Sequence, residues 1–440
     1  MSDIRPSAED GLPEPPGARS RRARAAGFAR RMALDITPLR SSRQFRLLWL
    51  GEVVSHTGRH ITVVALPFQV YQLTRSPLAV GLIGLVQIVP LIGFSLVGGA
   101  IADAVDRRKL LIWTELGLAA TSLLLVAGAV AGDPPLWFVY LAAGLLAALS
   151  AIESPARSAA IPNLVARKDL ASAIALNQVL FQVSDIVGPA VGGLILARLG
   201  LEWAYGIDAA SFLAAIVALL AMRPMPPTRE EGATRGLAAI REGFAYLKGR
   251  RVLISTFVID LNAMMFGMPR AVFPPLALDV IRVGPQGLGL LYAAPAAGAL
   301  LGALLTGWVR HVRHQGRAVM WAVIVWGAAI AAFGLSVTRA FWLGLAFLAV
   351  AGAADVFSAI FRSTILQGTV PDSLRGRLSA IHIMVVTGGP RLGDLEAGVV
   401  AQLVTPVFSV ISGGAATVLG VLILGWVVPE FWRYHAGDPA

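Results

Sequence analysis

Residues 77–109 read PLAVGLIGLVQIVPLIGFSLVGGAIADAVDRRK, and this stretch decides the fold. Its first 26 positions contain no Asp, Glu, Lys or Arg. A helix needs about 20 apolar residues to cross the hydrocarbon core of a bilayer. The apolar run ends in two aspartates and three consecutive basic residues. The sequence therefore predicts a membrane-spanning helix followed by a charged loop.

Apolar runs of this kind recur along the chain, of which 56% is hydrophobic and only 14% charged, against about 25% charged residues in soluble domains. This composition predicts an all-α membrane protein, with twelve transmembrane helices in two pseudo-symmetric six-helix bundles. The predicted spans lie near 46–72, 78–102, 110–131, 136–158, 173–197, 203–222, 252–276, 286–309, 318–337, 341–365, 378–403 and 406–428.

The polar segment 223–251 divides these spans six and six. We expect a disordered basic cytoplasmic tail, an N-terminal six-helix bundle, a cytoplasmic linker, a C-terminal six-helix bundle and a second cytoplasmic tail. Their predicted ranges are 1–43, 44–222, 223–251, 252–429 and 430–440.

The formal net charge is +11, and the placement of the basic residues along the chain indicates the orientation in the membrane. Most Lys and Arg residues fall in the two tails, the linker and alternate loops, whereas the opposite loops hold only Arg75, Arg198, Arg282 and Arg339. The positive-inside rule then places both termini in the cytoplasm. We expect the helices to lie in the cytoplasmic membrane of a bacterium. This pattern predicts a bilayer as partner and no nucleic acid.

The two predicted bundles repeat one another in sequence. When residues 77–109 are laid over 285–317, Gly81 meets Gly289 and Lys109 meets Arg317. At nearby offsets Arg157 meets Arg362, and Gly192 meets Gly398. Parallel repeats of six helices are typical of transporters whose substrate site lies between the halves near the bilayer midplane.

The loop after the second predicted span resembles the cytoplasmic loop signature of the major facilitator superfamily. It runs from Gly99 through Asp103 to Asp106, Arg107, Arg108 and Lys109. These residues lie at a helix end, where charges can pair with neighbouring helix termini and act as a gate. The alternative is that the basic trio only fixes topology.

The membrane region from about 43 to 435 is similar to the enterobactin-exporter-like branch of that superfamily, for example at Phe45-Arg-Leu-Leu-Trp-Leu and Pro371-Asp-Ser-Leu-Arg-Gly-Arg377. This resemblance implies a proton-driven exporter of siderophores or drugs. The run Gly188-Pro189-Ala-Val-Gly192-Gly193 resembles the antiporter signature, which favours export. Physically, this run allows close helix packing and a local bend, and plain packing is the alternative to gating.

Charged side chains inside spans are costly, so each indicates a partner, water or a function. Glu52, His56 and Arg59 share one helix face in the first span. We predict Glu52 and His56 as a proton-coupling pair and Arg59 as a substrate contact. A purely structural pairing of Glu52 with Arg59 or a histidine is the alternative.

The eleventh span carries Arg391, Asp394 and Glu396. Arg391 and Asp394 are three residues apart and can pair, whereas Glu396 lies about 140° around the helix from Arg391. We predict Asp394 and Glu396 as proton carriers and Arg391 as an anchor for an anionic substrate group. A structural salt bridge explains the first two equally well.

Polar residues in the fifth and seventh spans complete the predicted substrate site, at Gln182, Asp185, Asp260 and Asn262. We therefore predict a monomeric secondary transporter that moves a small molecule by alternating access, powered by a proton gradient and needing no metal or other cofactor. An importer of a nutrient and a non-transporting receptor are the alternatives. No P-loop, His-Glu-x-x-His or Gly-x-Ser-x-Gly motif points to an enzyme.

Overall fold

The computed structural model describes residues 35–226 and 237–436, and these residues form helices and no strand. The first half of the molecule holds α2 (Thr37–Ser41), α3 (Arg43–Thr74), α4 (Pro77–Ala104), α5 (Arg107–Val130), α6 (Leu136–Leu164), α7 (Leu170–Arg198) and α8 (Leu201–Leu220). The second half holds α9 (Leu237–Leu247), α10 (Arg251–Phe266), α11 (Phe273–Pro275), α12 (Gly284–Leu304), α13 (Gln315–Ser336), α14 (Phe341–Thr369), α15 (Asp372–Leu403), α16 (Pro406–Val427) and α17 (Pro429–Arg433).

Ten helical segments among the described residues are long and apolar enough to cross a bilayer. The long helices α3 and α15, of 32 residues each, are not among these ten. They carry the charged residues noted in the first and eleventh predicted spans, and these residues lower their mean hydropathy. Each predicted span nevertheless overlaps one helical segment, with ends displaced by a few residues.

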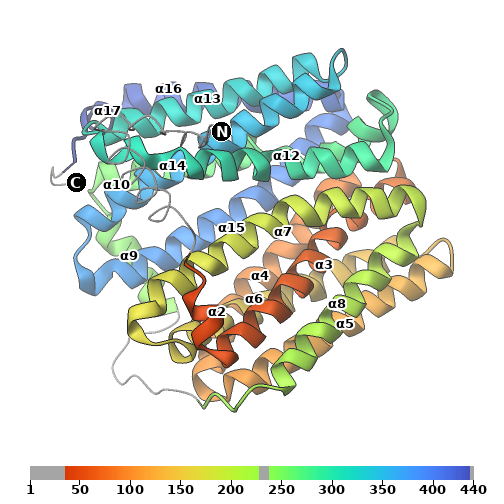
Figure 1. Ribbon diagram of the computed structural model, residues 1–440. Coiled ribbons are helices and arrows are strands. Elements are labelled where there is room, and N and C mark those ends of the chain that lie inside the picture. The colour runs from red at the N-terminus through yellow and green to blue at the C-terminus, as the bar shows by residue number, and fades with distance from the viewer. Residues whose placement is uncertain (1–34, 227–236, 437–440) are drawn as a thin grey trace, which may run out of the picture.

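The helices run roughly alongside one another, with α3 to α8 in the lower part of Figure 1 and α12, α13, α14, α16 and α17 in the upper part. Helix α15 lies between them, at the level of α7. Within the first half, α3 packs on α7 and α8, and α4 packs on α6. Within the second half, α14 packs on α12 and α13, and α16 packs on α13. The halves meet mainly where α4 packs on α15 and α7 packs on α12.

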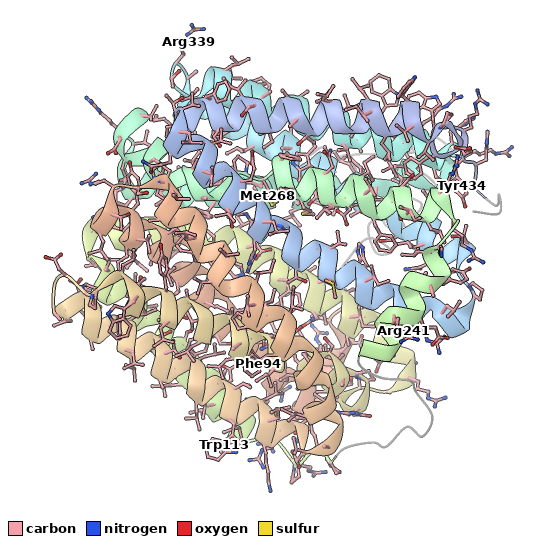
Figure 2. All side chains as sticks on the ribbon, turned by 180° about the vertical axis from the view of Figure 1, so that it is seen from behind. Phe94, Trp113, Arg241, Met268, Arg339 and Tyr434 are labelled. Atoms are coloured by element: carbon pink, nitrogen blue, oxygen red, sulfur yellow. The ribbon has the colours of Figure 1, made fainter. Side chains whose placement is uncertain are left out.

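Large apolar side chains cover the outer surface. Trp113, Trp342 and Trp426 are 71%, 73% and 83% exposed, and Trp113 points outward from α5 in Figure 2. Water would penalise such a surface, whereas hydrocarbon chains accept it. Arg339 lies at one end of the helices, and Arg241 and Tyr434 lie at the other (Figure 2).

Glycines allow close approaches between the halves. A Cβ on Gly81 of α4 would lie 3.2 Å from the Cα of Gly398 in α15. A Cβ on Gly193 of α7 would lie 2.8 Å from the Cα of Gly289 in α12. Both contacts therefore need residues without a side chain, as expected for membrane helices that pack backbone to backbone. The repeat thus aligns Gly193, rather than Gly192, with Gly398.

The loop between α4 and α5 caps one helix of the first half and is hydrogen-bonded to the end of another. The Asp106 carboxylate accepts hydrogen bonds from the backbone N–H groups of Arg108 and Lys109, so it caps α5. The Arg108 guanidinium donates to the carbonyl oxygens of Leu219 and Leu220 at the end of α8, both at 2.7 Å. The predicted pairing of this loop with neighbouring helix termini is therefore observed at Arg108.

Two neighbouring loop residues behave differently. Arg107 is buried and donates to the carbonyl oxygen of Ala159 in α6. No atom of the described residues lies within 4 Å of a Cβ built on Gly99, so none of them requires a glycine there. The side chain of Asp103 lies outside the described part of the chain.

The polar segments are partly helical. Residues 1–34, 227–236 and 437–440 lie outside the described residues, so most of the predicted N-terminal tail is not described. Within the range expected to be tail, α2 covers Thr37–Ser41 and α3 begins at Arg43, capped by the Ser42 hydroxyl. Within the expected linker, α9 packs against α15, where Glu242 and Arg377 form a 2.6 Å ion pair.

Candidate functional site

A cavity of about 450 Å³ lies between the two halves. Side chains of α3, α4, α6 and α7 line it on one side, and side chains of α12, α14, α15 and the 3₁₀ turn Arg270–Val272 line it on the other. Seven titratable side chains line it: Arg59, His60, Asp185, Arg270, Asp355, Arg391 and Asp394. A cavity with this lining suits a ligand that carries several polar or charged groups.

Arg270 and Arg391 face the cavity from the second half. Within the described part of the chain, neither guanidinium forms an ion pair, and Arg391 Nε is buried without a hydrogen-bond partner. The salt bridge between Arg391 and Asp394, which was the alternative to their predicted roles, is not formed. Asp394 instead accepts a hydrogen bond from the Ala271 N–H at 3.1 Å, so α15 is tied to the turn that carries Arg270.

A buried charge network fills the first half beside the cavity. Arg157 of α6 forms ion pairs with Glu153 and with Glu52, the latter at 2.5 Å, and lies 3.8 Å from Glu115. Arg59 donates to Glu153 at 2.9 Å. Glu52 is therefore paired mainly with Arg157, which neither sequence interpretation anticipated, and it lies outside the cavity lining.

A second buried pair lies in the second half, where Asp260 of α10 binds Arg362 of α14. The side chains are 1% and 2% exposed, and His382 Nδ1 lies 3.8 Å from Asp260. Asp260 was expected to line the cavity, but its pairing with Arg362 holds it outside the lining. Asp355 of α14 lines the cavity, and its Oδ1 has no partner among the described residues.

Three predicted polar residues have clear positions. Gln182 of α7 lines the cavity and donates to the Ala296 carbonyl of α12 at 2.8 Å, so it bridges the halves. Asn262 lies away from the cavity, because it donates to the Thr417 carbonyl at 2.9 Å and packs on Gly420. Glu396 is half-buried on α15, outside the cavity lining, and forms no ion pair within the described ranges.

The glycine-rich run of α7 packs on two helices. Gly188 and Gly192 lie against Thr57 and Ile61 of α3. Gly193 lies against α12, and Pro189 lines the cavity. The close packing predicted for this run is therefore present. Its role in gating stays a prediction.

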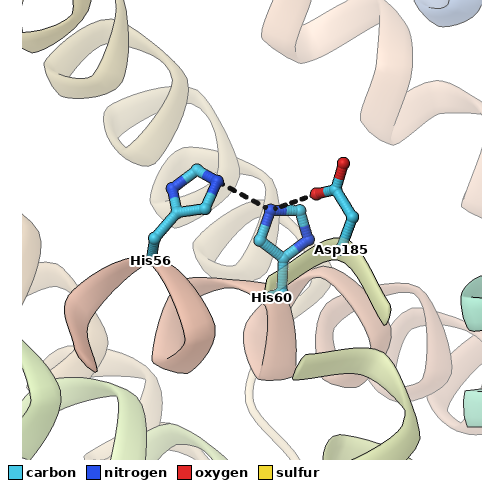
Figure 3. A group of neighbouring side chains, drawn as sticks. All are labelled: His56, His60 and Asp185. Carbon is cyan, nitrogen blue, oxygen red and sulfur yellow. Dashed lines mark hydrogen bonds and ion pairs between the residues drawn. The ribbon is translucent and has the colours of Figure 1, made fainter. Parts of the chain in front are cut away.

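His56, His60 and Asp185 form a compact group (Figure 3), and His60 and Asp185 line the cavity. His60 Nε2 lies 2.8 Å from Asp185 Oδ1 and 3.3 Å from His56 Nε2. The sequence placed His56 and His60 one turn apart, but it could not show that Asp185 of α7 meets them. Sequence reasoning also assigned no role to Arg270, although a charge inside a predicted span could have singled it out.

Solved structures of transporters share this fold. A POT family transporter in complex with 5-aminolevulinic acid has a TM-score of 0.73 at 10% identity, covering 89% of this chain and 97% of its own. The nucleoside transporter NupG has a TM-score of 0.68 at 14% identity, covering 89% and 99%. A bacterial homologue of the iron transporter ferroportin has a TM-score of 0.65 at 15% identity, covering 89% and 98%. The chain thus has the same fold as these transporters.

A profile of the transmembrane secretion effector family, within the major facilitator superfamily, matches residues 34–432, and the chain belongs to this family. The enterobactin exporter EntS of Shigella boydii is 28% identical over 409 residues, covering 92% of this chain and 97% of the relative. EntS of Escherichia coli matches with the same identity and coverage.

These comparisons confirm the predicted resemblance, and with it a multi-pass transporter of a bacterial inner membrane rather than an enzyme.

Proposed function

We propose that this protein exports a siderophore or a similar polar small molecule from the cytoplasm, driven by proton entry. The observation that carries the proposal is the charged cavity between the halves, with Arg270 and Arg391 unpaired in the described structure. A buried cation without a protein partner is costly, and an anionic or hydroxyl-rich substrate relieves that cost. The relatives named as enterobactin exporters support this class of substrate.

We also propose that α3 and α15 span the membrane, which brings the number of spans to twelve in two pseudo-symmetric bundles. Both helices are long enough, and four of their mid-helix charges, Glu52, Arg59, Arg391 and Asp394, are paired or line the cavity. The matching contacts Gly81 with Gly398 and Gly193 with Gly289 support a twofold relation. Each chain encloses its own cavity, which supports a monomer.

Both termini lie in the cytoplasm in this proposal, because the basic loops and segments gather at one end of the helices. The opposite, outer end is held shut between the halves. There Tyr71 donates to Asp279 at 2.5 Å, Arg75 pairs with Asp279 at 3.2 Å and Ser76 donates to Gln402 at 2.8 Å. These contacts would break when the cavity opens to the outside.

Proton coupling would use Asp394 and Glu396 on α15. We add Asp355 of α14 as a third candidate proton carrier, because it lines the cavity. Asp355 and Asp394 share the cavity with the two unpaired arginines. Protonation of an acid there and binding of an anionic substrate would favour opposite access states, and their competition couples the two fluxes. The loop residues Asp103 and Arg108 would gate the cytoplasmic end.

The test is uptake of enterobactin into inverted membrane vesicles with an imposed proton gradient. Wild type is compared with Asp394→Asn, Glu396→Gln and the surface control Asp133→Asn. Uptake that follows the gradient and is lost in either α15 variant, but not in the control, supports proton-coupled export. Gradient-independent uptake in all variants would refute the coupling, and flux in the opposite direction would make the protein an importer.

A further inference from the structure

We propose that His56, His60 and Asp185 form a binding site for a divalent transition-metal ion of the zinc, cobalt or nickel type, opening on the central cavity. The sequence alone gave no metal site, because α3 supplies two of these residues and α7 supplies the third. This proposal concerns ion binding by the protein itself and does not depend on the transported substrate.

The distances between the three ligand atoms fit one ion. A metal with bonds of about 2.0–2.2 Å to nitrogen and oxygen holds its ligand atoms roughly 3.3 Å apart in a tetrahedral site. The two histidine Nε2 atoms are 3.3 Å apart, and His60 Nε2 lies 2.8 Å from Asp185 Oδ1. All three ligand atoms lie within 4.8 Å of one another. Small side-chain movements would admit the ion.

The second ring nitrogen of His56 faces a carboxylate without forming a hydrogen bond to it. His56 Nδ1 lies 3.7 Å from Glu52, while His56 Nε2 points to His60. Metal-binding histidines commonly present one nitrogen to the ion and the other to a carboxylate or carbonyl. Histidines four residues apart on one helix also present their rings on the same face.

The backbone around the group is held in place on both helices. The Thr57 and Ser184 hydroxyls are hydrogen-bonded at 3.1 Å, one residue from His56 and one from Asp185. Gly188 lies against Thr57 and His60, so α3 and α7 approach closely at this level. A site on two packed helices keeps its geometry better than a site on loops.

Two imidazoles and one carboxylate favour zinc, cobalt or nickel over magnesium or calcium, which prefer oxygen ligands. The protein has no cysteine, so no thiolate competes for such ions. His60 and Asp185 line the cavity, which leaves further coordination positions facing it, as in metal sites that exchange ligands. In this assignment His56 binds metal and does not carry protons.

The experiment titrates the purified full-length protein, carrying no histidine tag, with Co²⁺ and Zn²⁺, following cobalt absorption and the heat of zinc binding. The variants are His60→Ala, Asp185→Asn and Asp185→His. The matched control is His314→Ala with His435→Ala, because these two exposed histidines also lie side by side, 4.2 Å between ring centroids, but outside the cavity.

We expect about one ion per chain, unchanged in the control, with affinity reduced at least tenfold in His60→Ala and Asp185→Asn. Asp185→His should restore most of the affinity, because it replaces one ligand by another, whereas a purely structural ion pair with His60 would not be restored. Absence of binding by a correctly folded wild type, or binding that only the control variant abolishes, would overturn the proposal. Thermal unfolding checks that each variant is folded.

Discussion

Arg362 of α14 forms a buried ion pair with Asp260 of α10, and the same relationship joins Arg157 of α6 to Glu52 of α3. Asp260 follows Glu52 by 208 residues, the offset that also relates Gly289 to Gly81. Each half therefore buries one acid and one arginine at corresponding positions. The repeat seen in the sequence preserves a pairing as well as a helix order.

Replacing Arg157 by Met should be severely destabilising, because it leaves Glu52, Glu115 and Glu153 buried without this arginine. Breaking a buried ion pair from one side costs about 3–5 kcal/mol. The measurement is thermal unfolding in detergent, with the exposed Lys168→Gln as control. Adding Glu153→Gln to Arg157→Met should recover part of the loss. If Arg157→Met unfolds like wild type, the network does not stabilise the fold.

Replacing Gly193 by Ala should push α7 away from α12, because the new Cβ would lie 2.6 Å from the Pro285 carbonyl oxygen. Overpacking of this kind costs about 1–3 kcal/mol. Gly206→Ala is the matched control, since nothing lies within 4 Å of its Cβ. We expect lower thermal stability and slower transport for Gly193→Ala only. Equal behaviour of the two variants would contradict the importance of this contact.

Replacing Asp279 by Asn should favour separation of the two halves at the end of the molecule where α3 ends. Both Tyr71 and Arg75 lose their acidic partner there. The chain has no cysteine, so spin labels can be placed at the exposed positions Leu199→Cys and Leu403→Cys without background labelling. We expect a larger population of long label-to-label distances than in wild type or Asp133→Asn. An unchanged distance distribution would count against this gate.

Replacing Arg391 by Gln should raise the KM for an anionic substrate roughly 10- to 100-fold, since a hydrogen bond to a charged group contributes about 1.5–3 kcal/mol. The KM of Arg391→Lys should lie between those of wild type and Arg391→Gln, because a lysine keeps the charge but not the forked geometry. Concentration-dependent uptake in inverted vesicles measures this, with the exposed Arg339→Gln as control. A changed maximal rate with unchanged KM would place Arg391 outside the binding step.

The candidate site was only partly predictable. Arg59, Gln182, Asp185 and Arg391 were expected as substrate contacts and do line the cavity. Of the four predicted proton carriers, only Asp394 lines it. Asp260 and Asn262 were expected there and do not, because α14 and α16 supply partners that no linear pattern identifies. Position within a span indicates that a polar group needs a partner, but it does not say which helix supplies one.

The sequence by itself determined that this chain is a helical membrane protein, because apolar runs of about 20 residues have few alternatives to spanning a bilayer. It also determined the repeat, the resemblance and the set of charges that needed an explanation. Only the tertiary structure decided how these charges meet: Glu52 with Arg157, Asp260 with Arg362, and two histidines with Asp185. Such pairings depend on the rotation and depth of separate helices, which are fixed by packing between helices rather than by the sequence of either one.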